Sequence, residues 1–206
     1  MITCIRELGF TIEEIHVEHF MRYLTHLLEW NKTINLTSII NPEEIIVKHF
    51  VDSLASLVSI TFPQNCVVLY IGSGGGFPGI PLRIMRSDMR LTLVEPVKKK
   101  CSFLNSVIGL LQLQNVATFN GTIEEYTKSQ SHNIIDMIVI RALKYEDILK
   151  HLPRLLSPIG KIVLYGTQAM RKQEFGKEFH ILSETALILP QGSGSRVITV
   201  IEKTDS

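Results

Sequence analysis

Apolar residues change their spacing near residue 62 of the chain. Before that point they recur every three or four residues, which is the period of a helix with one apolar face. A capping box of Thr11 and Glu14 predicts the start of one helix. Asn41, with Pro42 in the first helical position, predicts the start of a second. We therefore expect residues 1–61 to form a small helical N-terminal extension.

From residue 63 onward, short apolar or β-branched runs alternate with segments of helical length. The runs predict strands at 66–71, 91–95, 116–119, 134–140 and 161–165, and helices are expected at 78–86, 97–110 and 145–156. Strands that are apolar along their whole length are typical of a parallel sheet covered on both faces. Residues 62–206 are therefore expected to form an α/β domain, packed with the extension into one compact unit.

The last part of the chain departs from this alternation. Two apolar runs, 186–189 and 196–201, flank a Gly192-Ser193-Gly194 turn, and they predict a hairpin that closes the sheet edge in the antiparallel sense. A mostly parallel α/β sheet with such a hairpin is the layout of S-adenosylmethionine-dependent methyltransferases. A plain dinucleotide-binding domain usually lacks the hairpin.

Composition and charge remove several other classes. Of the 206 residues 45% are hydrophobic, and 21 Lys and Arg stand against 20 Asp and Glu, which is typical of a globular domain and excludes a disordered, collagen-like or coiled-coil chain. The three cysteines are scattered and none has metal-ligand spacing, so we expect neither a disulfide framework nor a metal site. No apolar run reaches the roughly 20 residues of a membrane helix, and the first residues do not resemble a signal peptide. The sequence therefore predicts a soluble, cytoplasmic protein.

A glycine-rich segment, residues 72–79, follows the first predicted strand directly. Glycines allow a sharp turn and a close approach of the backbone to a ligand. Gly74-x-Gly76-x-x-Gly79 matches the pattern of a dinucleotide site, whereas Gly72-x-Gly74-x-Gly76 matches the methyltransferase version. The glycines alone do not decide between these cofactors, and a tight turn without a ligand is the third interpretation.

Glu95 narrows this choice, because it ends the second strand where an acidic side chain can reach the ribose hydroxyls of a nucleoside. A solvated glutamate at a strand end is the alternative. The adjacent Lys98, Lys99 and Lys100 fit either an ordinary helix surface or a basic patch beside the site. Together the glycine segment and Glu95 indicate that a nucleoside cofactor binds here.

Three further residues follow later strands. Ile123 can sandwich an adenine base and Glu124 can order the backbone around it, although a first-turn helix acid explains Glu124 equally well. Arg141 ends an apolar strand at the edge where open α/β sheets bind ligands, so it is a candidate for a cofactor carboxylate or a substrate phosphate. Cys101 lies on a helix and is expected to pack rather than react. His49 and Asp52 are spaced for a pair across one helical turn.

Several blocks of residues resemble one family, the bacterial small-subunit (16S) rRNA guanine-N7 methyltransferases, also called glucose-inhibited division protein B. The resemblance covers nearly the whole chain. It rests on Trp30-Asn31-Lys32-x-x-Asn35-Leu36-Thr37, on His49-x-x-Asp52-Ser53-Leu54 and above all on Gly72-Ser73-Gly74-x-Gly76-Phe77-Pro78-Gly79-Ile80-Pro81-Leu82, with Val94-Glu95, Lys99-Lys100, Glu124-Glu125, Arg141-Ala142 and Arg196 as extensions.

The resemblance implies a Rossmann-like class I core with a seven-stranded sheet. It implies transfer of a methyl group from S-adenosyl-L-methionine to N7 of a guanine in 16S rRNA, in the decoding region of the small ribosomal subunit. We also expect the protein to be a cytoplasmic monomer that uses no metal. The cofactor contacts expected from it are Gly72, Gly74, Gly76, Phe77, Glu95, Ile123, Glu124 and Arg141. Guanine N7 carries no proton, so no general base is expected. Phe77 and Arg141 are the candidates for holding the guanine, with core packing as the alternative for Phe77.

This chain departs from the family pattern at three places. Tyr70 stands where an aspartate is common, and Thr122 stands where an arginine is usual. In the strand after Gly160 the family pattern ends in Lys-Gly, whereas this chain reads Tyr165-Gly166-Thr167. The missing cations are candidate RNA contacts, for which Lys98, Lys99, Lys100, Arg171 and Lys172 can substitute. The departures leave a second hypothesis, a catalytically weakened protein that still binds rRNA or the ribosome. A nicotinamide-dependent oxidoreductase is the third, and the terminal hairpin argues against it.

Overall fold

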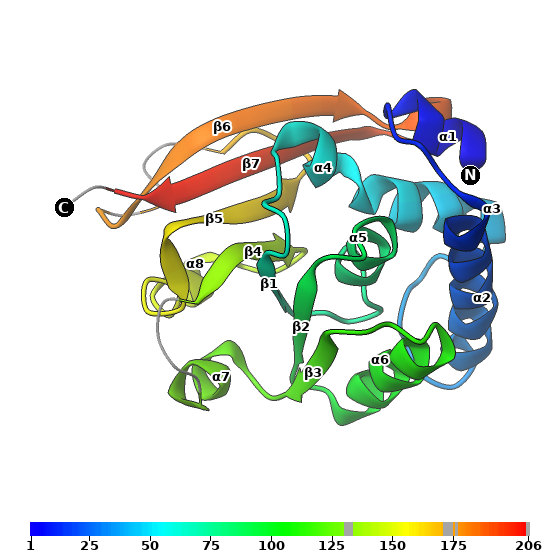
Figure 1. Ribbon diagram of the computed structural model, residues 1–206, viewed down its shortest axis with the longest axis horizontal. Helices are drawn as coiled ribbons and strands as arrows, with labels where there is room; N and C mark the ends of the chain where they lie inside the picture. Colours follow the sequence, from blue (N-terminus) through cyan, green and yellow to red (C-terminus); the bar gives the residue numbers. More distant parts are fainter. Residues whose placement is uncertain (130–133, 171–174, 176, 205–206) are drawn as a thin grey trace.

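A seven-stranded sheet forms the centre of the computed structural model, which describes residues 1–129, 134–170, 175 and 177–204. The strand order is β3-β2-β1-β4-β5-β7-β6 (Figure 1). Strands β1 to β5 pair in parallel, and β7 lies antiparallel between β5 and β6, so six of these seven strands run in one direction. The strands are β1 (Val67–Ile71), β2 (Arg90–Glu95), β3 (Val116–Asn120), β4 (Ile135–Arg141), β5 (Leu156–Gly166), β6 (Phe179–Ile188) and β7 (Ser195–Lys203). The predicted parallel sheet with a terminal antiparallel hairpin is confirmed.

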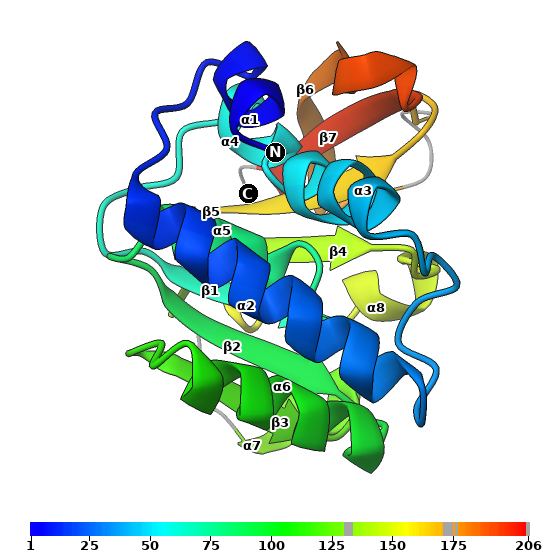
Figure 2. The same cartoon turned by 90° about the vertical axis from the view of Figure 1, so that its right-hand side faces the viewer.

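Helices cover both faces of this sheet (Figure 2). They are α1 (Ile2–Glu7), α2 (Glu14–Asn31), α3 (Pro42–Ile45), the π-helical turn η1 (Ile46–Val51), α4 (Ala55–Ser59), α5 (Gly79–Met85), α6 (Lys98–Leu110), α7 (Ile123–Ser129), α8 (Glu146–Leu149) and the 3₁₀ turn η3 (Pro190–Gly192). Alternate residues of β1 face opposite sides, as the pleat of a strand requires. Val68 and Tyr70 join the cluster under α2, α5 and α6, whereas Leu69 and Ile71 join the cluster under α7 and α8.

Two predicted helix boundaries are wrong. Helix α2 is capped by Glu13, whose side chain and that of His16 complete a capping box in place of Thr11 and Glu14. The helix predicted at 145–156 ends at Leu149, and the chain enters β5 at Leu156. Pro153 lies inside the predicted range, where its missing N–H and its ring disfavour a continuing helix. The start at Asn41 is confirmed, because its side chain accepts the N–H groups of residues 43 and 44.

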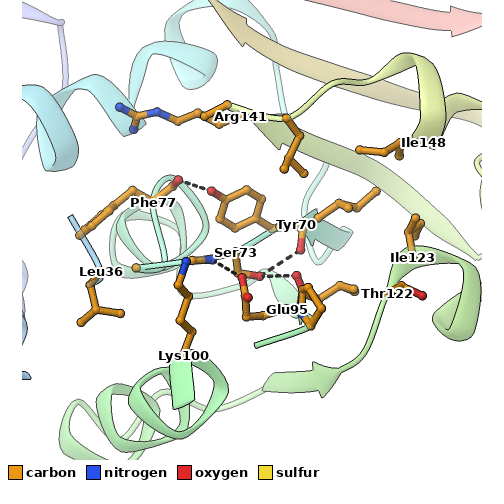
Figure 3. A pocket seen from close by; sticks show the side chains of 18 of the residues that line it. Leu36, Tyr70, Ser73, Phe77, Glu95, Lys100, Thr122, Ile123, Arg141 and Ile148 are labelled. Atoms are coloured by element: carbon orange, nitrogen blue, oxygen red, sulfur yellow. Dashed lines mark hydrogen bonds between the residues drawn. The ribbon is translucent and has the colours of Figure 1, made fainter. Parts of the chain in front are cut away.

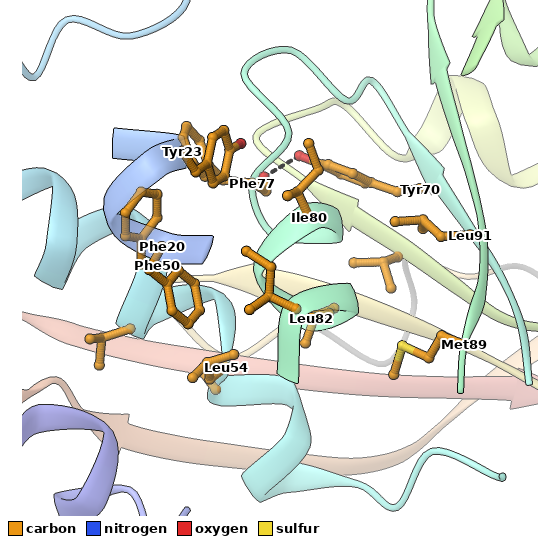
Figure 4. Packing of buried hydrophobic residues seen from close by; sticks show 14 of the residues in the cluster. Phe20, Tyr23, Phe50, Leu54, Tyr70, Phe77, Ile80, Leu82, Met89 and Leu91 are labelled. Carbon is orange, nitrogen blue, oxygen red and sulfur yellow. Dashed lines mark hydrogen bonds between the residues drawn. The ribbon is translucent and has the colours of Figure 1, made fainter. Parts of the chain in front are cut away.

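The helical extension shares one apolar core with the sheet (Figure 4). Tyr23 of α2 is fully buried, and its ring lies 5.2 Å from Phe50 of η1 and 5.4 Å from Phe77, which follows β1. Phe20 packs against Phe50 from the same helix. The first 61 residues therefore contribute directly to the layer beneath the glycine segment, while their separation as a domain stays a prediction.

Candidate functional site

A cavity of about 550 Å³ opens at the carboxyl ends of β1, β2 and β4 (Figure 3). This is the edge at which open α/β sheets bind their ligands. Six of the predicted cofactor residues line it, namely Gly72, Gly74, Phe77, Glu95, Ile123 and Arg141. Gly76 and Glu124 are not part of the lining, so the structure brings together most of the predicted site but not all of it.

The glycine segment follows β1 and is held from below by two tyrosine hydroxyls. Tyr23 donates to the carbonyl of Gly75, and Tyr70 donates to the carbonyl of Phe77. Tyr70 therefore supports this turn even though it stands where the family pattern has a carboxylate. Gly72 has a φ of +71°, and a Cβ there would overlap the end of the Leu143 side chain. The left-handed backbone favours glycine at that position.

Gly76 faces the core and not the cavity. Its φ is +92°, and a Cβ would come within 2.5 Å of the Tyr23 hydroxyl and 2.7 Å of Ile80 Cδ1. The glycine pattern alone does not tell whether the missing side chain makes room for a ligand or for another part of the protein. At Gly76 it makes room for Tyr23 of α2 and Ile80 of α5, where these two helices pack against each other.

Glu95 ends β2 with its carboxylate turned toward the glycine segment. The side chain is only 4% exposed, and its oxygens accept the N–H groups of Gly74 at 2.8 Å and of Val97 at 2.9 Å. A carboxylate can accept about four hydrogen bonds, so each oxygen retains capacity for a ligand hydroxyl. Cys101 is buried behind it and donates its thiol to the Glu95 carbonyl at 3.1 Å, which agrees with a packing role.

Arg141, at the end of β4, is fixed by a buried carboxylate. Its Nη2 lies 2.7 Å from Asp52 Oδ2 and 3.1 Å from the Lys48 carbonyl. Asp52 is fully buried and also binds Arg196 of β7 in a bidentate pair, at 2.6 and 2.8 Å. Nη1 of Arg141 is buried and has no hydrogen-bond partner among the described residues. Arg141 therefore lines the cavity and holds, within the protein, a buried donor that no described residue uses.

His49 lines the cavity, and the expected pair with Asp52 does not form, because Asp52 binds the two arginines. The imidazole lies flat on Phe77, with ring centres 4.6 Å apart and planes 10° apart. Its Nε2 meets the Thr37 hydroxyl at 2.7 Å and its Nδ1 the Lys48 carbonyl at 3.1 Å. Burial, together with the Arg141 guanidinium, lowers the pKa of His49 to about 4. The sequence motif contained His49, but spacing alone assigned it the wrong partner.

Asn31, in the block from Trp30 to Thr37, holds the loop before α3 by hydrogen bonds. Asn31 Oδ1 accepts the N–H groups of Leu36 at 2.9 Å and Thr37 at 3.1 Å, and its Nδ2 donates to the Thr37 carbonyl at 2.9 Å. Leu36 thereby reaches the cavity wall, and Thr37 reaches His49. Sequence reasoning noted this block but did not predict that it belongs to the site.

The far end of the cavity lies at the start of α7, where Thr122 and Ile123 line it. Thr122 and Glu125 form a reciprocal cap, with the Glu125 carboxylate accepting the Thr122 N–H at 2.7 Å. Thr122 thus starts a helix at the position where the family pattern has an arginine. Glu124 is exposed and pairs with Lys128 at 2.7 Å, which lowers its pKa and matches a helix acid better than a ligand contact.

Lys100 is the one lysine of its cluster in the cavity lining, whereas Lys98 and Lys99 are exposed on the first turn of α6. Arg171 and Lys172, which were expected to supply further cations, lie outside the described residues. Within the part of the chain that the structure describes, no three His, Cys, Asp or Glu side chains gather to hold a metal ion. No described helix is both long enough and apolar enough to cross a bilayer.

The sheet order, the terminal hairpin and a cavity at the ends of β1, β2 and β4 define the Rossmann-like class I fold of S-adenosylmethionine-dependent methyltransferases. MtNAS in complex with MTA and tNA superposes with a TM-score of 0.65 at 14% identity, over 91% of this chain and 71% of that one. A SAM-dependent methyltransferase from Aquifex aeolicus superposes with a TM-score of 0.56 at 13% identity, over 78% and 93%. At these identities the likeness concerns the fold alone.

The family model of GidB, rRNA small subunit methyltransferase G, matches residues 16–195, and the chain belongs to this family. Ribosomal RNA small subunit methyltransferase G of Bacillus pumilus is 30% identical over 97% of this chain and 87% of its own length. The protein of the same name from Desulforamulus reducens is 40% identical over 67% of this chain. That match spans 58% of the Desulforamulus protein, which is less than two thirds of its length.

Proposed function

We propose that this chain transfers a methyl group from S-adenosyl-L-methionine to N7 of a guanine in 16S rRNA of the small ribosomal subunit. Membership of the rRNA small subunit methyltransferase G family supports the reaction and the substrate. The observation that carries the proposal is the cavity itself, because it brings a buried carboxylate, Glu95, and a guanidinium group, Arg141, around one glycine segment. A cytoplasmic location follows from this substrate.

The residues around the cavity fit the cofactor. Arg141 suits the methionine carboxylate, because its guanidinium group lines the cavity and its Nη1 has no hydrogen-bond partner among the described residues. Glu95 suits the ribose hydroxyls, and Ile123 offers an apolar side chain for the adenine. Gly72, which has no side chain to shield its backbone, suits close approach of the ligand. When bound, S-adenosyl-L-methionine supplies an electrophilic methyl group on a positively charged sulfur.

The protein's own contribution is alignment and exclusion of water. Guanine N7 already presents a lone pair, so no side chain has to remove a proton. Holding two reactants in line can lower a barrier by about 7–11 kcal/mol. Arg141 and Glu95 are both fixed by buried or backbone partners, so they keep their orientation without a ligand. A rigid, partly enclosed site of this kind suits a reaction that needs positioning only.

The direct test is a methyl-transfer assay. Small ribosomal subunits that lack the modification are incubated with the protein and methyl-labelled S-adenosyl-L-methionine, and the rRNA is digested to nucleosides. We expect label in 7-methylguanosine. Label in another nucleoside would contradict the N7 assignment, and bound cofactor without label would point to a different substrate. Neither label nor cofactor binding would favour the hypothesis of a weakened protein that only binds rRNA or the ribosome.

Glu95 offers a second test, by calorimetric titration with S-adenosyl-L-methionine. Glu95→Gln removes the charge and is expected to raise Kd about 10- to 150-fold, the range of one charge-assisted hydrogen bond. Glu124→Gln is the matched control, because that carboxylate is exposed and pairs with Lys128 outside the cavity lining. We expect it to change Kd less than about twofold. Equal Kd values for the two variants would remove Glu95 from the ribose site.

A further inference from the structure

We propose that the cavity-facing side of the His49 ring is the surface on which the guanine stacks before it is methylated. This inference rests on the proposed function and adds the residue that receives the substrate base. It assigns His49 a role in binding and positioning, and no role in proton transfer.

A column of aromatic rings leads from the core to the cavity. Phe103 and Tyr23 lie 6.4 Å apart with planes 26° apart, Tyr23 and Phe77 lie 5.4 Å apart at 29°, and Phe77 and His49 lie 4.6 Å apart at 10°. Phe103, Tyr23 and Phe77 are buried, whereas His49 is half-buried and lines the cavity. Figure 4 shows Tyr23 and Phe77, the two middle rings of this column. His49 is the last ring of the column, and a purine that binds from the cavity side extends the stack by one ring.

Both nitrogens of the His49 ring are already engaged by the protein. A carbonyl can only accept, so Nδ1 carries the hydrogen and donates it to Lys48. Nε2 then accepts from the Thr37 hydroxyl, whose oxygen in turn accepts the Ile39 N–H at 3.1 Å. The ring is therefore fixed in orientation. With Phe77 on one face and both nitrogens bound, the opposite face is what remains for a ligand.

The charge state of His49 suits a guanine that reacts at N7. Burial is the main reason that the pKa of His49 falls to about 4, which keeps the ring neutral at pH 7. The charges of Arg141 on β4 and of Lys48 on its own turn also lower this pKa, while the hydrogen bond to the Lys48 carbonyl and the Asp52 carboxylate raise it. An N–H donor aimed at N7 would occupy the lone pair that attacks the methyl group. His49 has no free N–H, and Nη2 of Arg141 is engaged by Asp52 and the Lys48 carbonyl. Residues 46–51 form a π-helical turn, a feature frequent at functional sites.

Two substitutions distinguish the contribution of the aromatic face of His49 from that of its ring nitrogens. His49→Phe keeps an aromatic face and loses the polar atoms, whereas His49→Asn keeps a planar polar group and loses the aromatic ring. Each variant is compared with the wild type in affinity for unmodified small subunits, measured by filter binding with S-adenosylhomocysteine present, and in KM and kcat for methyl transfer. Cofactor Kd and melting temperature are measured for all three proteins.

We expect His49→Phe to stay within about threefold of the wild type and His49→Asn to lose about 5- to 150-fold in subunit affinity, the range of one base–aromatic stack. Cofactor Kd is expected to be unchanged in both. A loss in His49→Phe with His49→Asn intact, a loss in both, or a loss in neither would overturn the inference. Subunit binding with this pattern but no methyl transfer would refute the proposed reaction and keep the stacking role. A wild type that neither binds subunits nor transfers methyl would overturn both.

Discussion

Replacing Asp52 by alanine is expected to destabilise the protein by about 3–5 kcal/mol, the cost of leaving buried charge without its partner. Asp52 is fully buried and neutralises two guanidinium groups, Arg141 at 2.7 Å and Arg196 at 2.6 and 2.8 Å. Both arginine side chains are only 15% exposed, so water cannot replace the lost carboxylate fully. The same change frees Arg141 from its orientation, so cofactor affinity is expected to fall with stability.

Urea unfolding at pH 7 measures this loss. Glu44→Ala is the control, because its carboxylate pairs with Lys48 at 2.8 Å on the surface, where ion pairs contribute about 0–1 kcal/mol. If the unfolding free energy of Asp52→Ala is no lower than that of the control, the ion pairs of Asp52 with Arg141 and Arg196 are not a main source of stability.

Gly76→Ala is the second large effect, with an expected loss of about 2–6 kcal/mol from backbone strain and overpacking together. Gly76 has a φ of +92°, and the added methyl would lie 2.5 Å from the Tyr23 hydroxyl. To relieve this contact, α2 or the turn must move, and the turn carries Gly74 and Phe77 at the cavity wall. Cofactor affinity is therefore expected to fall even though Gly76 does not line the cavity.

Gly109→Ala is the matched control for this substitution. Gly109 lies in α6 with nothing within 4 Å of the position of a Cβ. An alanine there is expected to add about 0.5–1 kcal/mol of stability, because alanine loses less conformational freedom in a helix. Thermal unfolding and calorimetric titration compare the two variants. Similar melting temperatures for Gly76→Ala and the wild type would mean that the turn tolerates a side chain.

Features set by local sequence were predicted well. The parallel strands follow from apolar runs, and the positions of Gly72, Glu95 and Arg141 at strand ends follow from the alternation of strands and helices. Local sequence does not predict which group lies against the Cα of a glycine, because that depends on which distant residue packs there. Gly76 shows this, since its space is filled by a tyrosine 53 positions earlier in the chain.

Contacts between distant segments were not predictable from spacing. Asp52 and Arg196 are 144 residues apart, and no periodic pattern connects them. The spacing of three residues predicted a pair of His49 with Asp52. In the structure Asp52 binds Arg141 of β4 and Arg196 of β7 instead. In the sequence, Tyr70 and Thr122 mean the loss of a carboxylate and of an arginine that the family pattern contains. In the structure each makes a local hydrogen bond, Tyr70 to the Phe77 carbonyl and Thr122 to Glu125.

The shared carboxylate also orders events during synthesis. Arg196 lies on β7, which pairs with β5 and β6 on its two sides and follows both of them along the chain. A nascent chain that has emerged as far as β6 holds every residue of the glycine turn, Glu95 and Arg141, but its Asp52 has one cation in place of two. The arginine at the cavity wall therefore reaches its final electrostatic setting only after β7 has been synthesised and has paired with β5.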